Sequence, residues 1–365
     1  TPSDLPLVSL DQAEIERLES EHRGVSDVLP LSPLQQGLLF HSLYDDETPH
    51  VYLVQLVLDL TGHLDTERLR TAAQALLIRH PHLAAAFLHE GFTSPIQTVP
   101  KAPDLPWSYV DLSSLSASKR EASLNAFIER DRSIGFTPSC SPLLRFALVR
   151  LTAGRHRLIF THHHILLDGW SISVFWQELF ILYRAGVSRP DLPTATPYRD
   201  YLAWLQRQDR SLAEAAWRDA FEGLTEPTRL APSSTSAPVP AESVQLELSL
   251  ELTTSLSAFA WGNGLTLNTV VQLAWAMLLA SETKRNDVVF GITVAGRPPE
   301  LPGMERMVGL FINTVPLRLR LRPKETILQL LARLQEEQSR LLAHQHLGLS
   351  EIQRLAGVGE LFDTL

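Results

Sequence analysis

The chain has 365 residues, 44% of them hydrophobic, and this is enough for two compact lobes because a single core seldom grows beyond about 250 to 300 residues. Its 32 basic residues are outnumbered by 41 acidic ones and are dispersed, the formal net charge is -9, and neither a nucleic acid nor an anionic membrane is therefore expected as a partner. The lone cysteine, Cys140, cannot form an internal disulfide and favours a reducing, cytoplasmic location.

Residues 1–26 combine prolines with a short acidic helix pattern, and we expect an N-terminal linker there. They show no basic segment followed by an apolar core, so no secretory signal is predicted. Apolar residues recur at helical spacing in 34–43 and predict an early helix. The rest of the first half predicts a strand at 51–60, a helix at 66–80 capped by Asp65, and a hairpin of strands at 143–151 and 156–164.

A further helix is predicted directly after Gly169, with Gly186 as its C-terminal stop. Proline and small residues at 188–196 mark an inter-lobe linker, and a second loose stretch lies at 231–243. The remainder predicts a strand at 243–249, a helix at 253–264, a buried helix at 267–281, strands at 287–294 and 312–321, and a helix at 325–344. The apolar run at 267–280 is shorter than the ~20 residues that cross a bilayer, so no membrane span is expected.

Strands and helices alternate in both halves, which predicts an α/β (α+β) chain with mixed sheets. The expected organisation is an N-terminal linker at 1–26, a first lobe at 27–187, the inter-lobe linker at 188–196 and a second lobe at 197–365. No sequence repeat of short fixed period is present, so a solenoid is not expected.

Titratable residues, a glycine and a strand-to-helix junction coincide in 161–171 (THHHILLDGWS). Such a junction directs a side chain and backbone N–H groups into a cleft. A neutral imidazole accepts a proton from an attacking amine or hydroxyl near pH 7, a nearby carboxylate fixes its surroundings, and a glycine permits close backbone approach. His164, Asp168 and Gly169 therefore indicate acyl transfer.

Three other interpretations of this segment compete with acyl transfer. Successive strand residues point to opposite faces, so His162 and His164 share one face and His163 the other, and His163 is the expected core residue. His162, His164 and Asp168 could instead bind zinc or iron. A Ser-His-Asp hydrolase would need a G-x-S-x-G elbow, which is absent, and Cys140 has no histidine pattern coupled to it, which favours inert packing.

The segment HHHILLDGWS contains HHxxxDG and resembles the condensation domains of nonribosomal peptide synthetases, with His164 as the second histidine of the signature. Six blocks in the family's order cover nearly the whole chain, and they are far more specific than a lone HxxxD, which other acyltransferases of the same fold share. The other five are LSPLQQGLLFHSL (31–43), RHPHLAAAF (79–87), PYRDYLAWL (197–205), VAGRPPELPGMERMVGLFINTVPLR (294–318) and HQHLGLSEIQR (344–354).

The resemblance implies two chloramphenicol-acetyltransferase-like lobes arranged as a V, with a tunnel at their interface. It implies upstream and downstream peptidyl carrier proteins as partners, each presenting a thioester on 4'-phosphopantetheine, and neither a cofactor nor a metal on this chain. The acceptor amine would attack the donor carbonyl to form an amide. His164 would position or deprotonate the amine, and the Gly169 N–H would help to stabilise the oxyanion.

The resemblance also implies roles for residues around the motif. Asp168 is expected to be structural and paired with Arg297, because a buried carboxylate needs a cation or donors. His163 and Arg79 are expected to support the site. The side chains expected to line the tunnel are Trp170, Ser171, Asn313 and Ser32.

Two features depart from the family pattern. Ala84 stands where the family usually has arginine, and the chain stops at ELFDTL where the family continues, so the second lobe is expected to be incomplete. The leader at 2–19 resembles the sequence that follows epimerisation domains, which implies an upstream epimerisation domain among the neighbouring synthetase domains. HHILLDGWS (163–171) together with HQHLGLSEIQ (344–353) resembles the subtype that accepts a D-configured donor. An epimerisation domain of the same fold and a non-catalytic carrier-docking module are the alternative functions.

Overall fold

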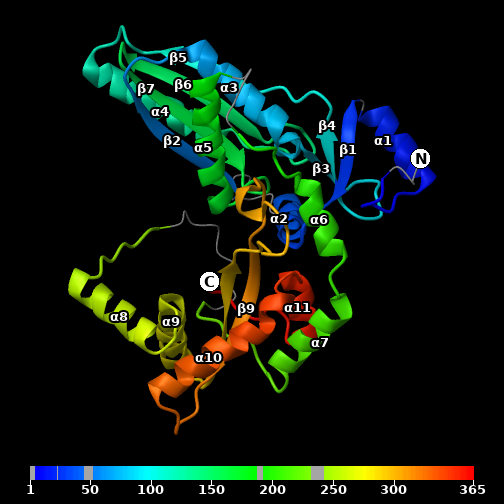
Figure 1. Cartoon of the computed structure of the whole chain (residues 1–365), viewed down its shortest axis with the longest axis vertical. Coiled ribbons are helices and arrows are strands. Elements are labelled where there is room, and N and C mark those ends of the chain that lie inside the picture. The colour runs from blue at the N-terminus through cyan, green and yellow to red at the C-terminus, as the bar shows by residue number, and fades with distance from the viewer. Residues whose placement is uncertain (1–4, 23, 45–51, 187–191, 232–241) are drawn as a thin grey trace. The chain divides into compact units, whose positions relative to one another are not determined.

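The computed structural model describes residues 5–22, 24–44, 52–186, 192–231 and 242–365. The chain forms two compact units (Figure 1). Unit 1 comprises Thr1–Arg207 with Arg297–Phe311, and unit 2 comprises Gln208–Gly296 with Ile312–Leu365. The segment Arg297–Phe311 therefore belongs to unit 1 although it follows most of unit 2 in the sequence.

The helices and strands of unit 1 are α1 (Gln12–Glu21), β1 (Val25–Pro30), α2 (Pro33–Tyr44), β2 (Leu53–Thr61), α3 (Thr66–Arg79), the 3₁₀ helix η2 (Pro81–Ala84), β3 (Ala86–Leu88), β4 (Ile96–Pro100), β5 (Trp107–Asp111), α4 (Ala117–Ser133), β6 (Leu144–Thr152), β7 (Arg155–His163), α5 (Gly169–Ala185), α6 (Tyr198–Gln206) and η3 (Met304–Arg306). Those of unit 2 are α7 (Arg210–Phe221), α8 (Leu250–Gly262), α9 (Leu267–Thr283), β8 (Asp287–Val294), β9 (Asn313–Arg320), α10 (Ile327–Leu341), η4 (Leu342–His344) and α11 (Leu349–Ala356). The predicted mixed α/β content is confirmed.

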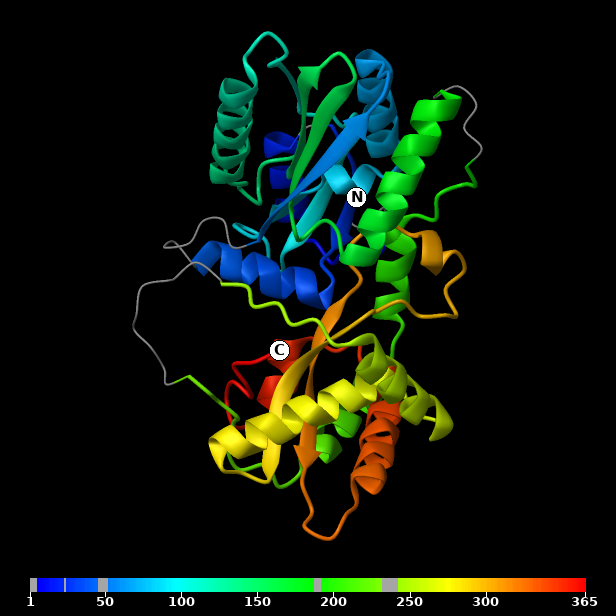
Figure 2. The same cartoon turned by 90° about the vertical axis from the view of Figure 1, so that its left-hand side faces the viewer.

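The larger sheet of unit 1 has the strand order β2-β7-β6-β5, in which β5 is parallel to β6 and the other neighbours are antiparallel. Successive strand residues point to opposite faces. Ala147 and Ile159 therefore pack with Leu124 of α4, whereas Phe160 stacks on Phe175 of α5 with ring centroids 4.9 Å apart. Figure 2 shows helices on both sides of this sheet. The predicted hairpin is confirmed as β6 and β7.

Two helix ends in unit 1 follow their predicted signals. The Asp65 carboxylate accepts a hydrogen bond from the Arg68 N–H at 3.0 Å and caps α3. α5 stops at Gly186, whose φ of 78° is a conformation that glycine adopts without a Cβ clash. Both ends fix the lengths of helices that cover the sheet.

A smaller sheet of unit 1 has the order β1-β4-β3. Ile15 and Leu18 of α1 are buried in one cluster with Val28 of β1 and Ile96 of β4. The described part of the segment expected to be an N-terminal linker is therefore packed into unit 1. Residues 1–4, 23, 187–191 and 232–241, on which parts of the predicted linkers fall, lie outside the described residues, and the lobe boundaries stay a prediction.

In unit 2, β8 and β9 pair antiparallel along their whole length. Val288 of β8 belongs to a cluster that includes Leu279 of α9 and Leu331 of α10. The next residue, Val289, belongs to a second cluster that includes Trp217 of α7. The two-stranded sheet is thus covered by helices on both faces.

Two expectations for unit 2 are wrong. Residues 243–249 were expected to form a strand but have no regular secondary structure, and Val244 and Leu246 are 95% and 85% exposed. Alternating apolar residues favour a strand, but a strand also needs a neighbour for its backbone groups, and these described residues have none. The helix at 267–281 exists as α9, yet it is buried on one side only, because Val271 is 56% exposed while Leu279 is fully buried.

Both α8 and α9 have an apolar composition. In the described part of the chain no single helix is long and apolar enough to span a membrane, and α8 and α9 pass that test only as a pair bent by 107°. Leu273, Ala276 and Leu279 of α9 lie in the helix-covered core of unit 2.

Candidate active site

The histidine run 162–164 lies at the end of β7, a central strand of the larger sheet. The His163 N–H donates to the Leu143 carbonyl at 2.9 Å, and the His164 N–H donates to the Tyr52 carbonyl at 2.7 Å. The backbone at this strand end is therefore held from both sides before the chain turns toward α5.

His163 is buried, and both of its ring nitrogens are satisfied within the protein. Its Nδ1 accepts from the Ile165 N–H at 3.1 Å, so Nε2 carries the ring hydrogen and donates to Ser42 Oγ at 3.3 Å. Ser42 in turn donates to the Leu38 carbonyl at 2.8 Å. Burial lowers the pKa of His163 to about 4. The ring is thus neutral and holds the turn that follows it, as expected of a core histidine.

His162 is also buried, being 1% exposed. Its ring stacks on Phe160 with centroids 4.9 Å apart, and its Nδ1 donates to the His163 carbonyl at 3.0 Å. Burial lowers the pKa of His162 to about 4. Two of the three motif histidines are therefore neutral packing groups at physiological pH.

We expect the stability of the chain to fall when the pH drops below the ordinary histidine value of 6.5. Burial lowers the pKa of His162 and His163 to about 4 and that of His82 to about 3. Between pH 6.5 and those values the unfolded chain binds protons that the folded chain does not bind, which costs up to about 1.4 kcal/mol per pH unit for each such histidine. Denaturant titrations at pH 8, 6.5 and 5 measure this slope.

In a His82→Gln variant the slope below pH 6.5 should be shallower than in the parent. Substitution of the exposed His63 is the matched control, and the slope of His82→Gln should be shallower than the slope of that variant. Equal stability at pH 8 and pH 5 would contradict the expectation.

His164 is the least buried of the three motif histidines. Its Nδ1 is shielded from solvent and has no hydrogen-bond partner among the described residues. An imidazole that is partly exposed and whose backbone is fixed can be reached by a bound group and can exchange a proton with it. His164 is therefore the histidine of this motif that is suited to chemistry.

Asp168 is buried and caps α5. Its Oδ1 accepts from the Ser171 N–H at 2.7 Å, and its Oδ2 accepts from the Phe311 N–H at 3.0 Å. Its own N–H donates to the Gly309 carbonyl at 3.1 Å. The carboxylate thus joins the start of α5 to the segment Arg297–Phe311 and has no lone pair aimed at an open surface, since its side chain is 0% exposed.

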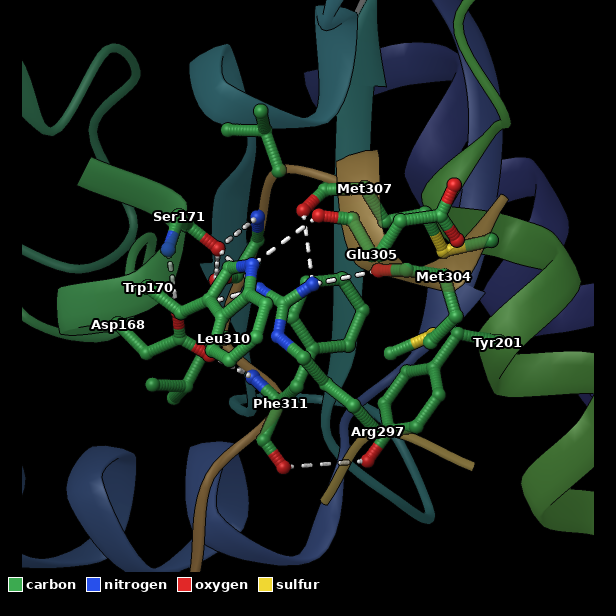
Figure 3. A network of polar contacts seen from close by, with 12 residues as sticks. Asp168, Trp170, Ser171, Tyr201, Arg297, Met304, Glu305, Met307, Leu310 and Phe311 are labelled. Atoms are coloured by element: carbon green, nitrogen blue, oxygen red, sulfur yellow. Dashed lines mark hydrogen bonds and ion pairs between the residues drawn. The ribbon is translucent and has the colours of Figure 1, made fainter. Parts of the chain in front are cut away.

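Arg297 approaches the same carboxylate, with its Nη2 3.3 Å from Asp168 Oδ1 (Figure 3). Its guanidinium also donates to Ser171 Oγ at 2.8 Å and to the carbonyls of Met304 and Met307 at 2.6 and 3.1 Å. Burial lowers the pKa of Arg297, and the charge of Asp168 opposes that shift. The predicted Asp168–Arg297 pair is confirmed, and its many donors and acceptors offset the desolvation of both charges.

Ser171 is buried in this network rather than open to a ligand. Its hydroxyl donates to the Gly309 carbonyl at 2.7 Å and accepts from the Gly309 N–H at 3.0 Å. A Cβ at Gly309 would lie 2.6 Å from the Tyr198 ring, so glycine is required there for close approach. The Tyr198 hydroxyl donates to the Leu310 carbonyl at 2.8 Å. Ser171 therefore anchors the segment Arg297–Phe311, and its expected role in lining a tunnel stays a prediction.

Gly169 and Trp170 form the exposed first turn of α5. A Cβ at Gly169 would meet no atom within 4 Å. The Trp170 side chain is 55% exposed, its Nε1 donates to the Glu305 carbonyl at 3.0 Å, and its ring lies 5.4 Å from the Arg297 guanidinium. The first turn of α5 therefore has an exposed glycine with open space beside its Cα.

We expect Gly169→Ala to slow turnover by at least about tenfold, because the added methyl displaces a bound substrate from its reacting geometry. The same change should alter the unfolding free energy by less than about 0.5 kcal/mol, since no atom of unit 1 is near the new methyl. Gly262→Ala, at the end of α8, is the matched control because that glycine also has nothing within 4 Å. Paired rate and melting measurements separate the two effects, and a Gly169→Ala protein that melts early would contradict this view.

Arg79 lies at the end of α3, away from the hydrogen bonds of the motif. It pairs with Glu178 of α5 at 2.9 and 3.2 Å, and His80 Nε2 lies 2.6 Å from the same carboxylate. Burial acts to raise the pKa of Glu178, but hydrogen bonds from His80 and Arg79 outweigh it and hold the pKa below its ordinary value. Arg79 therefore joins α3 to α5, and its support of the site stays a prediction.

Ser32 and Asn313 are both buried. Ser32 Oγ accepts from the Gln35 N–H at 3.3 Å at the start of α2. Asn313 belongs to unit 2, where its side chain donates to the carbonyls of Gln345 and Leu347 at 2.8 Å each. In the structure both residues hold neighbouring backbone, and a lining role for either stays a prediction.

Two alternatives raised by the sequence concern a metal site and Cys140. No group of three or more His, Cys, Asp and Glu side chains that could hold a metal occurs within the described ranges. Cys140 is exposed and unbridged, so the expectation that it is packed is wrong. It lies beyond the C-terminal end of α4, next to proline-rich sequence that keeps it at the surface.

Sequence reasoning missed three side chains that hold the backbone of the site. Gln35 Nε2 donates to the Ile165 carbonyl at 3.1 Å, and His82 Nε2 donates to the Val308 carbonyl at 2.7 Å. Tyr198 is the third, through its bond to the segment Arg297–Phe311. All three lie in blocks that pointed to the family, but a block does not say which distant carbonyl its side chain reaches.

The chain matches a known family model and several known proteins. A family model described as "Condensation domain" matches residues 25–364. The chain is 37% identical to a linear gramicidin synthase of Brevibacillus parabrevis over 374 residues, covering 100% of this chain and 5% of that protein. It is 33% identical to bacitracin synthase 3 of Bacillus licheniformis over 365 residues, covering 98% of this chain and 6% of that protein. The chain thus spans a small part of the length of these relatives.

Solved structures share the fold. The first condensation domain of the calcium-dependent antibiotic synthetase, in complex with a substrate analogue, is 26% identical with a TM-score of 0.72, over 93% of this chain and 81% of that one. The X-domain from teicoplanin biosynthesis, in complex with OxyB, is 25% identical with a TM-score of 0.76, over 90% and 73%. These likenesses confirm the predicted chloramphenicol-acetyltransferase-like fold class.

Proposed function

This chain belongs to the condensation-domain family, and from that premise we propose that it is an acyltransferase that joins two carrier-bound thioesters through a new amide bond. The donor is an aminoacyl or peptidyl thioester and the acceptor is an aminoacyl thioester. The relatives in Brevibacillus parabrevis and Bacillus licheniformis are named as synthases of linear gramicidin and bacitracin, which supports a place in nonribosomal peptide synthesis.

The single observation that carries this proposal is His164, whose backbone is fixed and whose side chain, unlike those of His162 and His163, is partly exposed. The acceptor nitrogen attacks the donor carbonyl, the carbon–nitrogen bond forms, and the carbon–sulfur bond then breaks. His164 orients the amine or takes its proton, and the proton is passed to the departing thiolate. The Gly169 N–H, at the open start of α5, helps to stabilise the oxyanion of the tetrahedral intermediate.

The other motif residues hold this arrangement in place. Asp168 and Arg297 are a buried structural pair, and His163 supports the turn before the helix. In this proposal the donor-side lobe spans 27–187 and the second lobe 197–365. The partners are upstream and downstream carrier proteins, each bearing 4'-phosphopantetheine, within a cytoplasmic synthetase. The motifs at 163–171 and 344–353 support a D-configured donor, and the leader at 2–19 supports a neighbouring epimerisation domain.

The test loads both carriers with isotopically distinguishable aminoacyl groups, mixes them with the chain, and follows the dipeptidyl carrier by mass spectrometry. We expect dipeptide on the acceptor carrier only when both loaded carriers and the chain are present. Donors of L and D configuration, compared at equal loading, report the stereochemical preference. Inversion of the donor α-carbon without dipeptide formation would contradict the proposal and indicate an epimerase.

A non-catalytic docking module is the second candidate, because the similar X-domain has been solved in complex with another protein, OxyB. Carrier binding without either dipeptide or inversion would favour that function. The HHxxxDG motif, with a partly exposed His164 ring on a fixed backbone, favours catalysis over docking, since a docking surface needs no positioned imidazole.

A further inference from the structure

The short loop between β7 and α5 carries His164, and hydrogen bonds hold its peptide planes one after another. The His164 N–H donates to Tyr52, and the Ile165 N–H donates to His163 Nδ1 at 3.1 Å. The Leu166 N–H donates to the His163 carbonyl at 3.1 Å. The Ile165 carbonyl, in the plane directly after that of His164, is held by a side chain from a distant part of the sequence.

That side chain is Gln35 of α2, which is 2% exposed and lies 130 positions away from Ile165. Its Nε2 donates to the Ile165 carbonyl at 3.1 Å. Ile165 is itself fully buried. If Gln35 were replaced, water could not take its place as the donor to the Ile165 carbonyl. The side-chain amide of Gln35 thus joins α2 to the loop between β7 and α5.

The amide of Gln35 has a fixed orientation. Its Oε1 accepts from the Ser32 N–H at 2.9 Å and from Gln97 Nε2 at 3.4 Å. Gln97 is 1% exposed and donates also to the Pro30 carbonyl at 2.7 Å. The oxygen of Gln35 therefore faces two donors, and its nitrogen faces one acceptor. A flipped amide would place its nitrogen against the two donors and its oxygen against the Ile165 carbonyl.

We infer that Gln35 is a positioning residue for His164, acting through the Ile165 carbonyl without touching the substrate. The inference rests on the proposed function for its rate readout, but its geometric part stands on these contacts alone. A shift of about 1 Å in a reacting group is enough to cost up to ~10²-fold in rate. Loss of the Gln35 bond should therefore lower kcat and leave KM for each carrier nearly unchanged.

The decisive variant is Gln35→Glu, which has the same shape. An ionised carboxylate still accepts from Ser32 and Gln97, but it repels the Ile165 carbonyl instead of donating to it. Burial raises the pKa of a carboxyl group, so the protonated form, which can donate, is reached as the pH falls. The rate of Gln35→Glu relative to the parent should therefore be about tenfold to a hundredfold low at pH 8.5 and recover toward one at pH 6.

Gln36→Glu is the matched control because it makes the same change at the adjacent, exposed position. Its rate relative to the parent should stay near one across this pH range. Reporting each variant as a ratio to the parent removes the pH dependence of the acceptor amine itself. Melting of every variant at each pH distinguishes a lost fold from a misplaced His164.

Two outcomes would overturn the inference. One is a Gln35→Glu rate equal to that of the parent at every pH, and the other is a loss that is the same at pH 6 and pH 8.5, which packing alone would give. If the parent forms no dipeptide, the proposed function fails, and the His164 ring resonance in histidine-labelled protein then tests Gln35 separately. That resonance should differ from the parent's in Gln35→Glu at pH 8.5 and return at pH 6, and an unchanged resonance would also refute the role.

Discussion

Replacing His164 by alanine is expected to slow amide formation by about 10²- to 10⁴-fold, the range typical of a lost general base. The folded state should survive the change, because the His164 contact that fixes the loop is made by its backbone N–H, which alanine retains. The measurement is single-turnover dipeptide formation on loaded carriers, with circular dichroism and melting on the same samples.

Comparing the His164→Ala loss between acceptors distinguishes two roles of His164. If His164 removes a proton, the loss shrinks as the acceptor amine becomes more readily deprotonated. If His164 only orients the amine, the loss is the same for amines of similar shape. A series of acceptors that differ in basicity but not in bulk separates the two roles.

His163→Ala is the matched comparison within the motif. It removes the acceptor for the Ile165 N–H and the donor to Ser42, so it should lower the melting temperature, whereas His164→Ala should not. Near-parental turnover in His164→Ala together with abolished turnover in a stable His163→Ala would show that the catalytic histidine is the other one.

The sequence predicted elements well where a local signal decides the structure. The cap at Asp65 and the stop at Gly186 act within one helical turn, so their residue types are sufficient to place the ends of α3 and α5. The strand expected at 243–249 failed for the opposite reason. Its apolar alternation is local, but a strand also needs a partner whose position the local sequence does not encode.

The candidate site also combines features that the sequence predicted with contacts that it did not predict. His164, Asp168 and Gly169 are close in sequence, so one motif brings them together whatever the rest of the chain does. The pairing of Asp168 with Arg297 was reached through a family resemblance and is present. The bonds from Gln35 and His82 were not predicted, because each joins a side chain to a carbonyl more than a hundred positions away and any polar side chain could make them.

The second large effect concerns stability: Asp168→Ala is expected to lower the free energy of unfolding by about 3 to 5 kcal/mol, because it leaves Arg297 as a buried cation without its counter-charge. The Asp168 and Arg297 side chains are 0% and 7% exposed, so water cannot replace the lost carboxylate. The change also removes the cap on Ser171 and the acceptor for the Phe311 N–H. Chemical denaturation, monitored for the transition of unit 1, measures the loss.

Two further variants separate the charge from the hydrogen bonds. Asp168→Asn keeps an oxygen that can cap Ser171 but loses the charge, so its cost reports the ion pair more than the cap. Arg297→Met removes the cation, and in its background Asp168→Ala should cost less than in the parent, because no unpaired charge is then left behind. Equal costs of Asp168→Ala in both backgrounds, or an Asp168→Ala protein that melts like the parent, would show that the pair does not stabilise this junction. The carboxylate would then have to be retained for a reason connected with the reaction, and its loss should appear in kcat instead of in the melting curve.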